Sequence, residues 1–231
     1  MATLFPPPAV VSIPIKHSQS TFPVHRIYCV GRNYAEHAKE MGFDARELPF
    51  FFGKQPDAIL YVPEGETGRF PYPAHTENLH HEVELVVAIG KGGSAIPAAV
   101  ALEHVLGFAV GLDMTRRDLQ FALRDKGRPW DAAKAFDHAA PISAIAMQED
   151  VGNMSSGGIW LKVNEQPRQA SDVTKLIWSI GEIIEHLSGY FTLQPGDLIF
   201  TGTPEGVGPV RRGDVIHAGV ERVGELRVQV V

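Results

Sequence analysis

The stretch that decides the fold is His80-His81-Glu82-Val83-Glu84-Leu85-Val86-Val87-Ala88-Ile89-Gly90. Its β-branched run, closed by glycines, predicts a strand. Successive side chains of a strand point to opposite faces, so Glu82 and Glu84 are expected on the same side. Two ionised carboxylates at such a short distance repel each other, so the pair needs water, a shared proton or a cation. A solvated edge strand is the alternative, because glutamates are ordinarily exposed.

The composition is that of an ordinary globular protein. The chain has 231 residues, of which 44% are hydrophobic and 21% charged, which is enough for a substantial core. A net charge of −6 without a long Lys/Arg run argues against nucleic acid or membrane as the main partner and favours a small molecule. The single cysteine, Cys29, favours a reducing compartment, and no export signal or membrane span is apparent, so we expect a cytoplasmic protein.

Two parts are expected along the chain, a Pro-rich arm over residues 1–24 and one catalytic domain over residues 25–231. Short runs of alternating hydrophobic residues dominate, particularly in the second half, so the predicted fold class is α+β, mainly β, with mixed coiled sheets and a few flanking helices. Helices are expected over residues 33–42, 96–106, 115–126 and 173–187.

A third carboxylate joins the pair on the strand. Asp113 follows the predicted strand 105–112, although aspartates at strand ends are also common in turns. Three hard oxygen ligands with room for water suit Mg²⁺ or Mn²⁺ better than a zinc site, whereas His80 and His81 are expected to pack or to support the ligands.

His37 and Glu40 lie three positions apart in the helix expected over residues 33–42, so their side chains share a face. A solvated surface pair is the alternative interpretation. The short helix between Gly31 and Gly42 also predicts a lid over residues 33–47 that becomes ordered when substrate binds.

Six motifs occur in a family-specific order. They are Gly31-Arg32-Asn33-Tyr34-Ala35-Glu36-His37, His80 to Leu85, Leu112-Asp113-Met114-Thr115 with Asp118 and Gln120, Lys134-Ala135-Phe136, Leu161-Lys162-Val163-Asn164, and Thr201-Gly202-Thr203-Pro204-Glu205-Gly206-Val207-Gly208. Over residues 25–231 the chain resembles the fumarylacetoacetate hydrolase superfamily, in its acylpyruvate hydrolase branch, and is most similar to the bacterial fumarylpyruvate hydrolases. The resemblance implies the β-roll fold of that superfamily and a homodimer.

Carried over by position, the resemblance implies roles for nine residues. Mg²⁺ or Mn²⁺ would be held by Glu82, Glu84 and Asp113, the base would be His37 with Glu40, and the substrate would meet Lys134, Arg117, Gln120 and Thr203. Lys134 on the surface and Thr203 in a simple turn are the alternatives. Lys54 is left out, because Gln55 separates it from Pro56 where the family often has Lys-Pro.

The resemblance implies metal-dependent hydrolysis of a C–C bond in an acylpyruvate, with fumarylpyruvate giving fumarate and pyruvate in gentisate-type aromatic catabolism. Oxaloacetate decarboxylation is an alternative on the same metal site, as are the related isomerase and hydratase reactions. A non-catalytic metal-binding domain is a further alternative.

Overall fold

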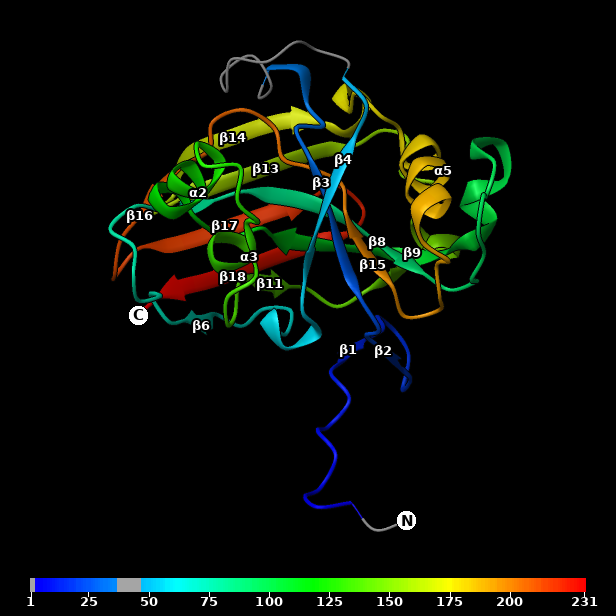
Figure 1. Cartoon of the computed structure of the whole chain (residues 1–231), viewed down its shortest axis with the longest axis horizontal. Coiled ribbons are helices and arrows are strands. Elements are labelled where there is room, and N and C mark those ends of the chain that lie inside the picture. The colour runs from blue at the N-terminus through cyan, green and yellow to red at the C-terminus, as the bar shows by residue number, and fades with distance from the viewer. Residues whose placement is uncertain (1–2, 37–46) are drawn as a thin grey trace.

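The computed structural model describes residues 3–36 and 47–231, which are built mainly from strands (Figure 1). The largest sheet has the strand order β4 (Phe50–Lys54), β3 (Ile27–Gly31), β15 (Leu198–Phe200), β8 (Val83–Ile89), β9 (Val105–Leu112), β11 (Ala140–Ile142) and β5 (Ile59–Tyr61), and β12 (Ala146–Met147) also pairs with β9. It is mixed, since β15 runs parallel to β3 and antiparallel to β8. Every residue of β8 is buried, which explains its continuous hydrophobic run.

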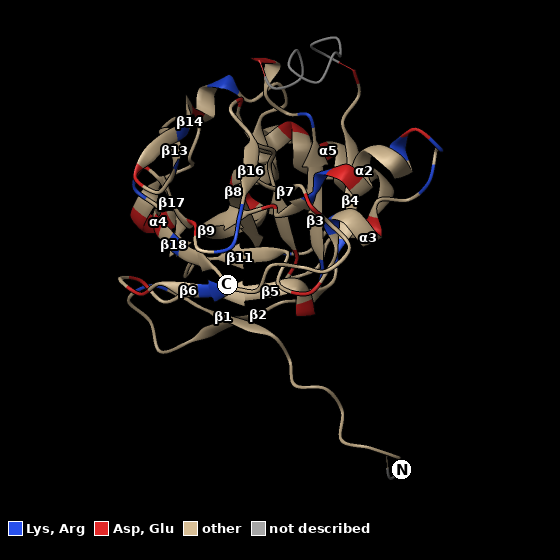
Figure 2. Cartoon of the chain, turned by 90° about the vertical axis from the view of Figure 1, so that its left-hand side faces the viewer, with Lys and Arg blue, Asp and Glu red and all other residues tan. Residues whose placement is uncertain are grey.

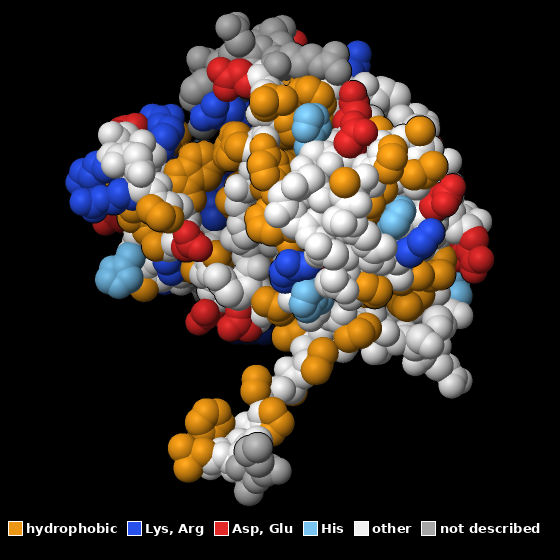
Figure 3. Space-filling model, turned by 45° about the vertical axis from the view of Figure 1, so that its right-hand side comes forward, with side chains coloured by type: hydrophobic (Ala, Val, Ile, Leu, Met, Phe, Trp, Pro, Cys, Tyr) orange, Lys and Arg blue, Asp and Glu red, His pale blue; other side chains and the backbone are white. Residues whose placement is uncertain are grey.

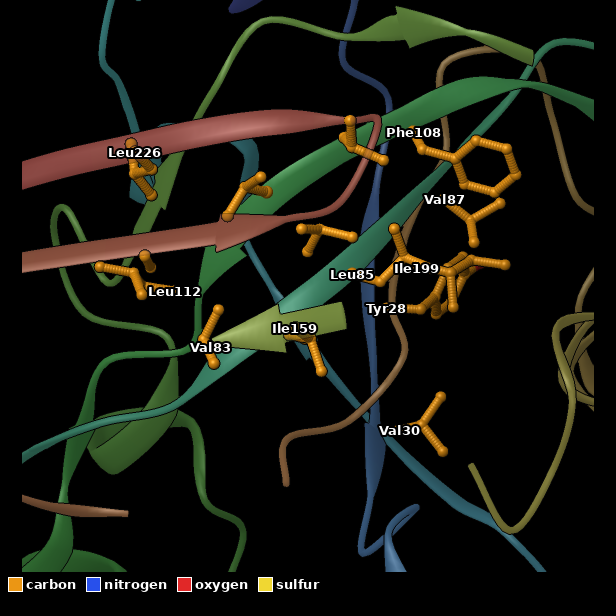
Figure 4. Close-up of a cluster of buried hydrophobic side chains, with 14 of the residues drawn as sticks. Tyr28, Val30, Val83, Leu85, Val87, Phe108, Leu112, Ile159, Ile199 and Leu226 are labelled. Atoms are coloured by element: carbon orange, nitrogen blue, oxygen red, sulfur yellow. The ribbon is translucent and has the colours of Figure 1, made fainter. Parts of the chain in front are cut away.

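A second sheet lies against one face of the first. Its strands are β14 (Gln166–Asp172), β13 (Gly158–Val163), β17 (Val215–Val220), β18 (Gly224–Val230) and β6 (Gly68–Phe70). Val83, Leu85 and Val87 of β8 pack with Ile159 and Leu226 of this sheet in the main core (Figure 4). The intervening positions of β8, Val86 and Ala88, enter a smaller core with Ile13 and Phe22 of the hairpin β1 (Ser12–Pro14) and β2 (Thr21–Pro23).

The strand expected from His80 to Gly90 is interrupted at Glu82. Before the break, β7 (Leu79–His81) pairs with β10 (Thr115–Arg116) and β16 (Gly208–Val210) in a small sheet, whereas β8 pairs with β9 and β15. The carbonyl of Glu82 accepts a hydrogen bond from the backbone N of Asp113 at 2.9 Å. One carboxylate therefore sits at the junction of two sheets and the other at the start of β8.

Within residues 3–36 and 47–231 the helices are few, as expected, but those that can be compared are shorter than predicted. They are α2 (Arg117–Arg124), α3 (Asp131–Lys134), α4 (Gln148–Val151) and α5 (Ile180–Tyr190), with the 3-10 turns η1 (Pro56–Ala58), η2 (Ala98–His104) and η3 (Val173–Lys175). The prediction of one helix over 173–187 is wrong, because a capping box of Ser179 and Glu182 starts a new helix there. The expected helix over 96–106 is a 3-10 turn followed by β9, and the one expected from residue 115 starts at Arg117, after β10.

The N-terminal residues 3–10 extend away from the body, with Leu4 96% and Phe5 70% exposed (Figures 1 and 3). The mixed β architecture with few helices is confirmed, whereas most of the helix and lid expected over residues 33–47 lies outside the described residues. Acidic and basic residues are interspersed in the view of Figure 2. Among the described residues, the helices are too short or too polar to cross a lipid bilayer.

Candidate active site

A pocket opens between the β3–β4 edge of the large sheet and the helices α2 and α3. Glu82, Glu84 and Asp113 line it together with Lys134 and Thr203. Sequence positions between 30 and 203 therefore meet in one cavity.

The three carboxylates predicted as metal ligands are brought together by strand register. Glu84 of β8 is paired with Gly111 of β9, and Asp113 comes two residues after Gly111, directly after the end of β9. One ligand oxygen from each of Glu82, Glu84 and Asp113 lies within 4.8 Å of the others. Their exposures of 5, 2 and 1% exclude the alternative of a solvated strand edge.

Two of the predicted substrate residues hold these carboxylates. The Nζ of Lys134 lies 2.8 Å from Glu82 Oε2 and 2.6 Å from Asp113 Oδ2, and Arg117 Nη2 donates to Glu82 Oε1. Burial acts to lower the pKa of Lys134, but Asp113 and Glu82 together raise it above its ordinary value, so the ammonium stays charged. Lys134 is 3% exposed, so its alternative placement on the surface is wrong.

Lys54, which the sequence interpretation left out, belongs to the same cluster. Its buried Nζ lies 2.8 Å from Asp113 Oδ1 and donates to the carbonyl of Lys134. Phe52, two residues earlier on β4, lines the pocket. Alternation along a strand places Phe52 and Lys54 on one face, and this was the signal available in the sequence. Gln55 comes after Lys54, so its presence before Pro56 does not change the face of β4 on which Lys54 lies.

Glu84 shows why the cluster suits a cation. Its Oε2 accepts a hydrogen bond from Gly202 N at 2.6 Å. Burial raises the pKa of Glu84 well above its ordinary value, and Asp113 and Glu82 raise it further. A dication among these oxygens would offset both the cost of burying the Glu84 charge and its repulsion by the other two carboxylates. The all-oxygen donor set of Glu82, Glu84 and Asp113 therefore fits Mg²⁺ or Mn²⁺.

Arg117 and Gln120 form one face of α2 toward the pocket. Arg117 Nη1 donates to Gln120 Oε1 at 2.5 Å, and its Nε donates to His80 Nδ1 at 3.3 Å. Burial and the Arg117 charge lower the pKa of His80 to about 4, so His80 is neutral at pH 7 and can accept that hydrogen bond. His80 thus supports Arg117, in line with the supporting role expected from the sequence.

Thr203 lines the pocket, but its hydroxyl is engaged with backbone and a buried glutamine. Its Oγ1 donates to Val83 O at 2.8 Å and accepts from Gln169 Nε2 at 2.8 Å. Gln169 Oε1 also accepts from Val83 N at 3.1 Å and lies 3.0 Å from His81 Nδ1. Gln169 therefore fixes the Thr203 loop to the start of β8. The sequence interpretation missed it, because a polar residue in a hairpin is usually exposed.

Replacing Gln169 with Leu should lower the free energy of unfolding by about 2–4 kcal/mol, because Val83 N and other buried polar groups would lose their partner. Urea denaturation of the metal-free protein measures this loss. Gln166→Leu, an exposed change on the same strand, serves as the matched control. Equal stability of the two variants would show that Gln169 is not a clamp.

His37 and Glu40 lie outside the described residues 3–36 and 47–231. The nearby described residues Val30, Gly31 and Arg32 line the pocket where β3 ends.

Comparisons with known proteins agree with this geometry. The family model for the fumarylacetoacetate (FAA) hydrolase C-terminal region matches residues 26–231. A fumarylpyruvate hydrolase from Ralstonia sp is 49% identical, covering 80% of this chain and 93% of that protein, and the mitochondrial oxaloacetate tautomerase FAHD1 of Mus musculus is 46% identical, covering 88% and 90%.

A crystal structure of fumarylpyruvate hydrolase from Pseudomonas aeruginosa, in complex with Mn²⁺ and pyruvate, superposes with a TM-score of 0.98 at 55% identity. The superposition covers 100% of this chain and 99% of that one. The ordered motifs, the fold and the carboxylate pocket thus agree, and the chain belongs to the fumarylacetoacetate hydrolase family.

Proposed function

We propose that this protein is a divalent-metal-dependent hydrolase that cleaves the C–C bond of an acylpyruvate, with fumarylpyruvate giving fumarate and pyruvate. The observation that carries the proposal is the buried cluster of Glu82, Glu84 and Asp113 in a pocket that also holds Lys134 and Arg117. The fumarylpyruvate hydrolases among its relatives, one of them with Mn²⁺ and pyruvate, support this substrate.

The three carboxylates would hold Mg²⁺ or Mn²⁺, which supplies a Lewis acid for the 2-oxo acid end of the substrate. Metal binding requires ionised ligands, so Glu82, Glu84 and Asp113 would then carry three negative charges, and Lys54, Lys134 and Arg117 carry three positive ones. This set is neutral by itself, so a bound dication leaves the site positive. An anionic substrate is therefore attracted, and Lys134, Gln120 and the backbone of Thr203, whose hydroxyl already donates to Val83 O, are proposed to orient its oxygens.

His37, oriented by Glu40, is proposed to take a proton from water. The water oxygen then bonds to the distal carbonyl carbon of the acyl group, and the C–C bond to the pyruvate methylene breaks. The electron pair of that bond leaves as pyruvate enolate, which is reprotonated at carbon. Lys134 and Arg117 lie where they can stabilise the developing negative charge.

Oxaloacetate chemistry is the second candidate, and the 46% identity to an oxaloacetate tautomerase favours it. Oxaloacetate presents the same carboxylate and 2-oxo oxygens. Its decarboxylation or tautomerisation needs no attacking water, so it would not require a water-activating base. A non-catalytic metal-binding domain finds no support in a pocket with this set of charged side chains.

An absorbance assay separates these functions. The purified protein is incubated with Mg²⁺ or Mn²⁺ and, in turn, fumarylpyruvate, maleylpyruvate, acetylpyruvate and oxaloacetate. We expect pyruvate to be released from fumarylpyruvate, with activity lost on chelation of the metal. Consumption of oxaloacetate alone would overturn the proposal.

A homodimer is proposed on the basis of exposed hydrophobic residues. Tyr190 is 71% and Phe191 43% exposed, and their rings contact Phe51 and Tyr28 at centroid distances of 6.3 and 5.1 Å. The N-terminal arm exposes further hydrophobic side chains (Figure 3). An exposed patch of this kind is typical of an interface between copies.

Sedimentation of the full chain should give the mass of two copies, and Tyr190→Ser should shift the protein toward the monomer because it removes an exposed ring from this patch. Val100→Ser, at a 39% exposed residue on η2, is the control and should leave the dimer intact. A monomeric wild-type protein at micromolar concentration would contradict the dimer.

Three further assignments are part of the proposal. Residues 25–231 are taken as one catalytic domain and residues 1–24 as an arm. The reaction is placed in gentisate-type aromatic catabolism, which would supply the fumarylpyruvate. A cytoplasmic location is inferred, which the buried free thiol of Cys29 supports; cell fractionation tests it.

A further inference from the structure

Two arginines stand in the pocket apart from the carboxylate cluster. Arg32 and Arg124 both line the cavity, and their side chains are 22% and 37% exposed. The carboxylates are at most 5% exposed, so the arginines occupy the end nearer to solvent. A substrate bound by its 2-oxo acid end at the carboxylates would extend its acyl chain toward them.

Local structure fixes both guanidinium groups on aromatic rings. The Arg32 guanidinium lies 5.3 Å from the centre of the Phe50 ring, and that of Arg124 lies 4.8 Å from the centre of Phe121. Phe50 in turn meets Trp130 edge to face at 5.5 Å. All three aromatic residues line the pocket, so they offer flat walls beside the two charges.

The turn that carries Arg32 is held in an unusual conformation. Arg32 has a φ of 59°, in the left-handed region that non-glycine residues seldom adopt. The preceding Gly31 has no room for a side chain, since the Phe50 ring would lie 2.0 Å from an added Cβ. Such strained positions are found where a side chain has to be held in a fixed place.

The carboxylates beside the two arginines are exposed to solvent, whereas those deeper in the pocket are buried. Arg32 lies 4.0 Å from Glu47 Oε2 and Arg124 2.9 Å from Asp125 Oδ1, and these carboxylates are 69% and 65% exposed. Burial lowers the pKa of Arg32; Glu47 opposes this shift, whereas Arg124 adds to it. The two guanidinium groups thus repel each other, and an anion between them would relieve that repulsion.

From this arrangement we propose that Arg32 and Arg124 bind a terminal carboxylate on the acyl chain of the substrate, with Phe50, Phe121 and Trp130 as the walls along that chain. The proposal rests on the acylpyruvate hydrolase function and narrows its substrate class to acylpyruvates with an anionic tail. A planar unsaturated chain between two carboxylates, as in a fumaryl group, matches both the walls and the charges. Guanidinium groups pair with carboxylates through two parallel hydrogen bonds, which gives such a site its specificity.

The test compares two substrates that differ at the tail. Fumarylpyruvate carries a terminal carboxylate and acetylpyruvate a methyl group, while the 2,4-dioxo acid portion is shared. We expect Arg124→Met and Arg32→Met each to lower kcat/KM for fumarylpyruvate by about 10- to 100-fold, the range for a lost charged hydrogen bond. For acetylpyruvate kcat/KM should fall at most about threefold, because the lost arginine only weakens the positive potential that attracts the anionic substrate.

Arg128→Met is the matched control, because Arg128 is exposed and is not among the residues that line this pocket. It should leave the ratio of kcat/KM for the two substrates unchanged. Fumarate gives a second measurement, since its inhibition of the wild-type enzyme should weaken in Arg124→Met and not in Arg128→Met. Circular dichroism verifies that each variant is folded, and Arg124, on α2, avoids the strained turn of Arg32.

The outcomes separate this proposal from the function on which it rests. If the wild-type protein hydrolyses neither substrate, the function itself fails. If it hydrolyses both and neither arginine variant changes their ratio, the acylpyruvate hydrolase function stands and the carboxylate subsite is wrong. A selective loss on fumarylpyruvate in Arg124→Met, absent in Arg128→Met, establishes the subsite.

Discussion

Glu84→Gln should abolish metal-dependent turnover and weaken Mn²⁺ binding by about 100-fold or more, since it removes one of three anionic ligands. The variant should nevertheless fold. Gly202 N can still donate to the amide oxygen, and the repulsion from Asp113 and Glu82 disappears. Glu82→Gln should also abolish turnover, but it would in addition weaken the pairing with Arg117 and Lys134, so Glu84→Gln is the cleaner variant.

The metal-free protein gives this prediction a second readout. Because folding raises the pKa of Glu84, its ionised form lowers the stability of the folded state at pH values above the ordinary glutamate pKa. Glu84→Gln should therefore raise the melting temperature in chelator near pH 8. The gain should shrink as the pH falls and Glu84 takes up a proton.

Calorimetric titration with Mn²⁺ and thermal unfolding in chelator measure the two effects. Glu103→Gln, an exposed change on η2, should alter neither. Unchanged Mn²⁺ affinity in Glu84→Gln would show that the metal is held elsewhere.

His37→Ala should impair turnover without impairing metal binding, in contrast to Glu84→Gln, which should impair both. We expect Mn²⁺ binding to be kept, while kcat for fumarylpyruvate hydrolysis falls by about 100- to 10,000-fold, the range for loss of a general base. Any oxaloacetate decarboxylation should fall much less, because that reaction needs no activated water. Steady-state assays on both substrates, together with the same calorimetric titration, test this. Loss of the metal in His37→Ala would mean that the assigned roles of base and ligand are wrong.

Local sequence was sufficient where the signal lies in one element or its end. The β-branched run after Glu82 predicted a strand, and Asp113 was expected at the end of the next one. Both positions followed from periodicity and turn chemistry, which depend on neighbours along the chain. The motifs added the family and with it the seven described residues predicted for the site, all of which line one pocket.

Contacts between distant segments decided the rest. Lys54 lies on the edge strand β4, and only the pairing of β4 with β3 brings its side chain to the distant Asp113. Gln169 lies on a hairpin where a polar residue is normally exposed, and it is buried because the Thr203 loop packs over it. The break at Glu82 likewise arises because β7 and β8 pair with different sheets.

The sequence by itself determined the chemistry of the site, a set of carboxylates with cationic partners, because residue type fixes which ions and protons can be held. Only the tertiary structure decided which cations neutralise the buried carboxylates and which lie at the outer end of the pocket. Lys54, Lys134 and Arg117 face the acids, while Arg32 and Arg124 lie toward solvent. That division depends on distance and burial, because the strength of a charge interaction is set by separation and by the surrounding dielectric.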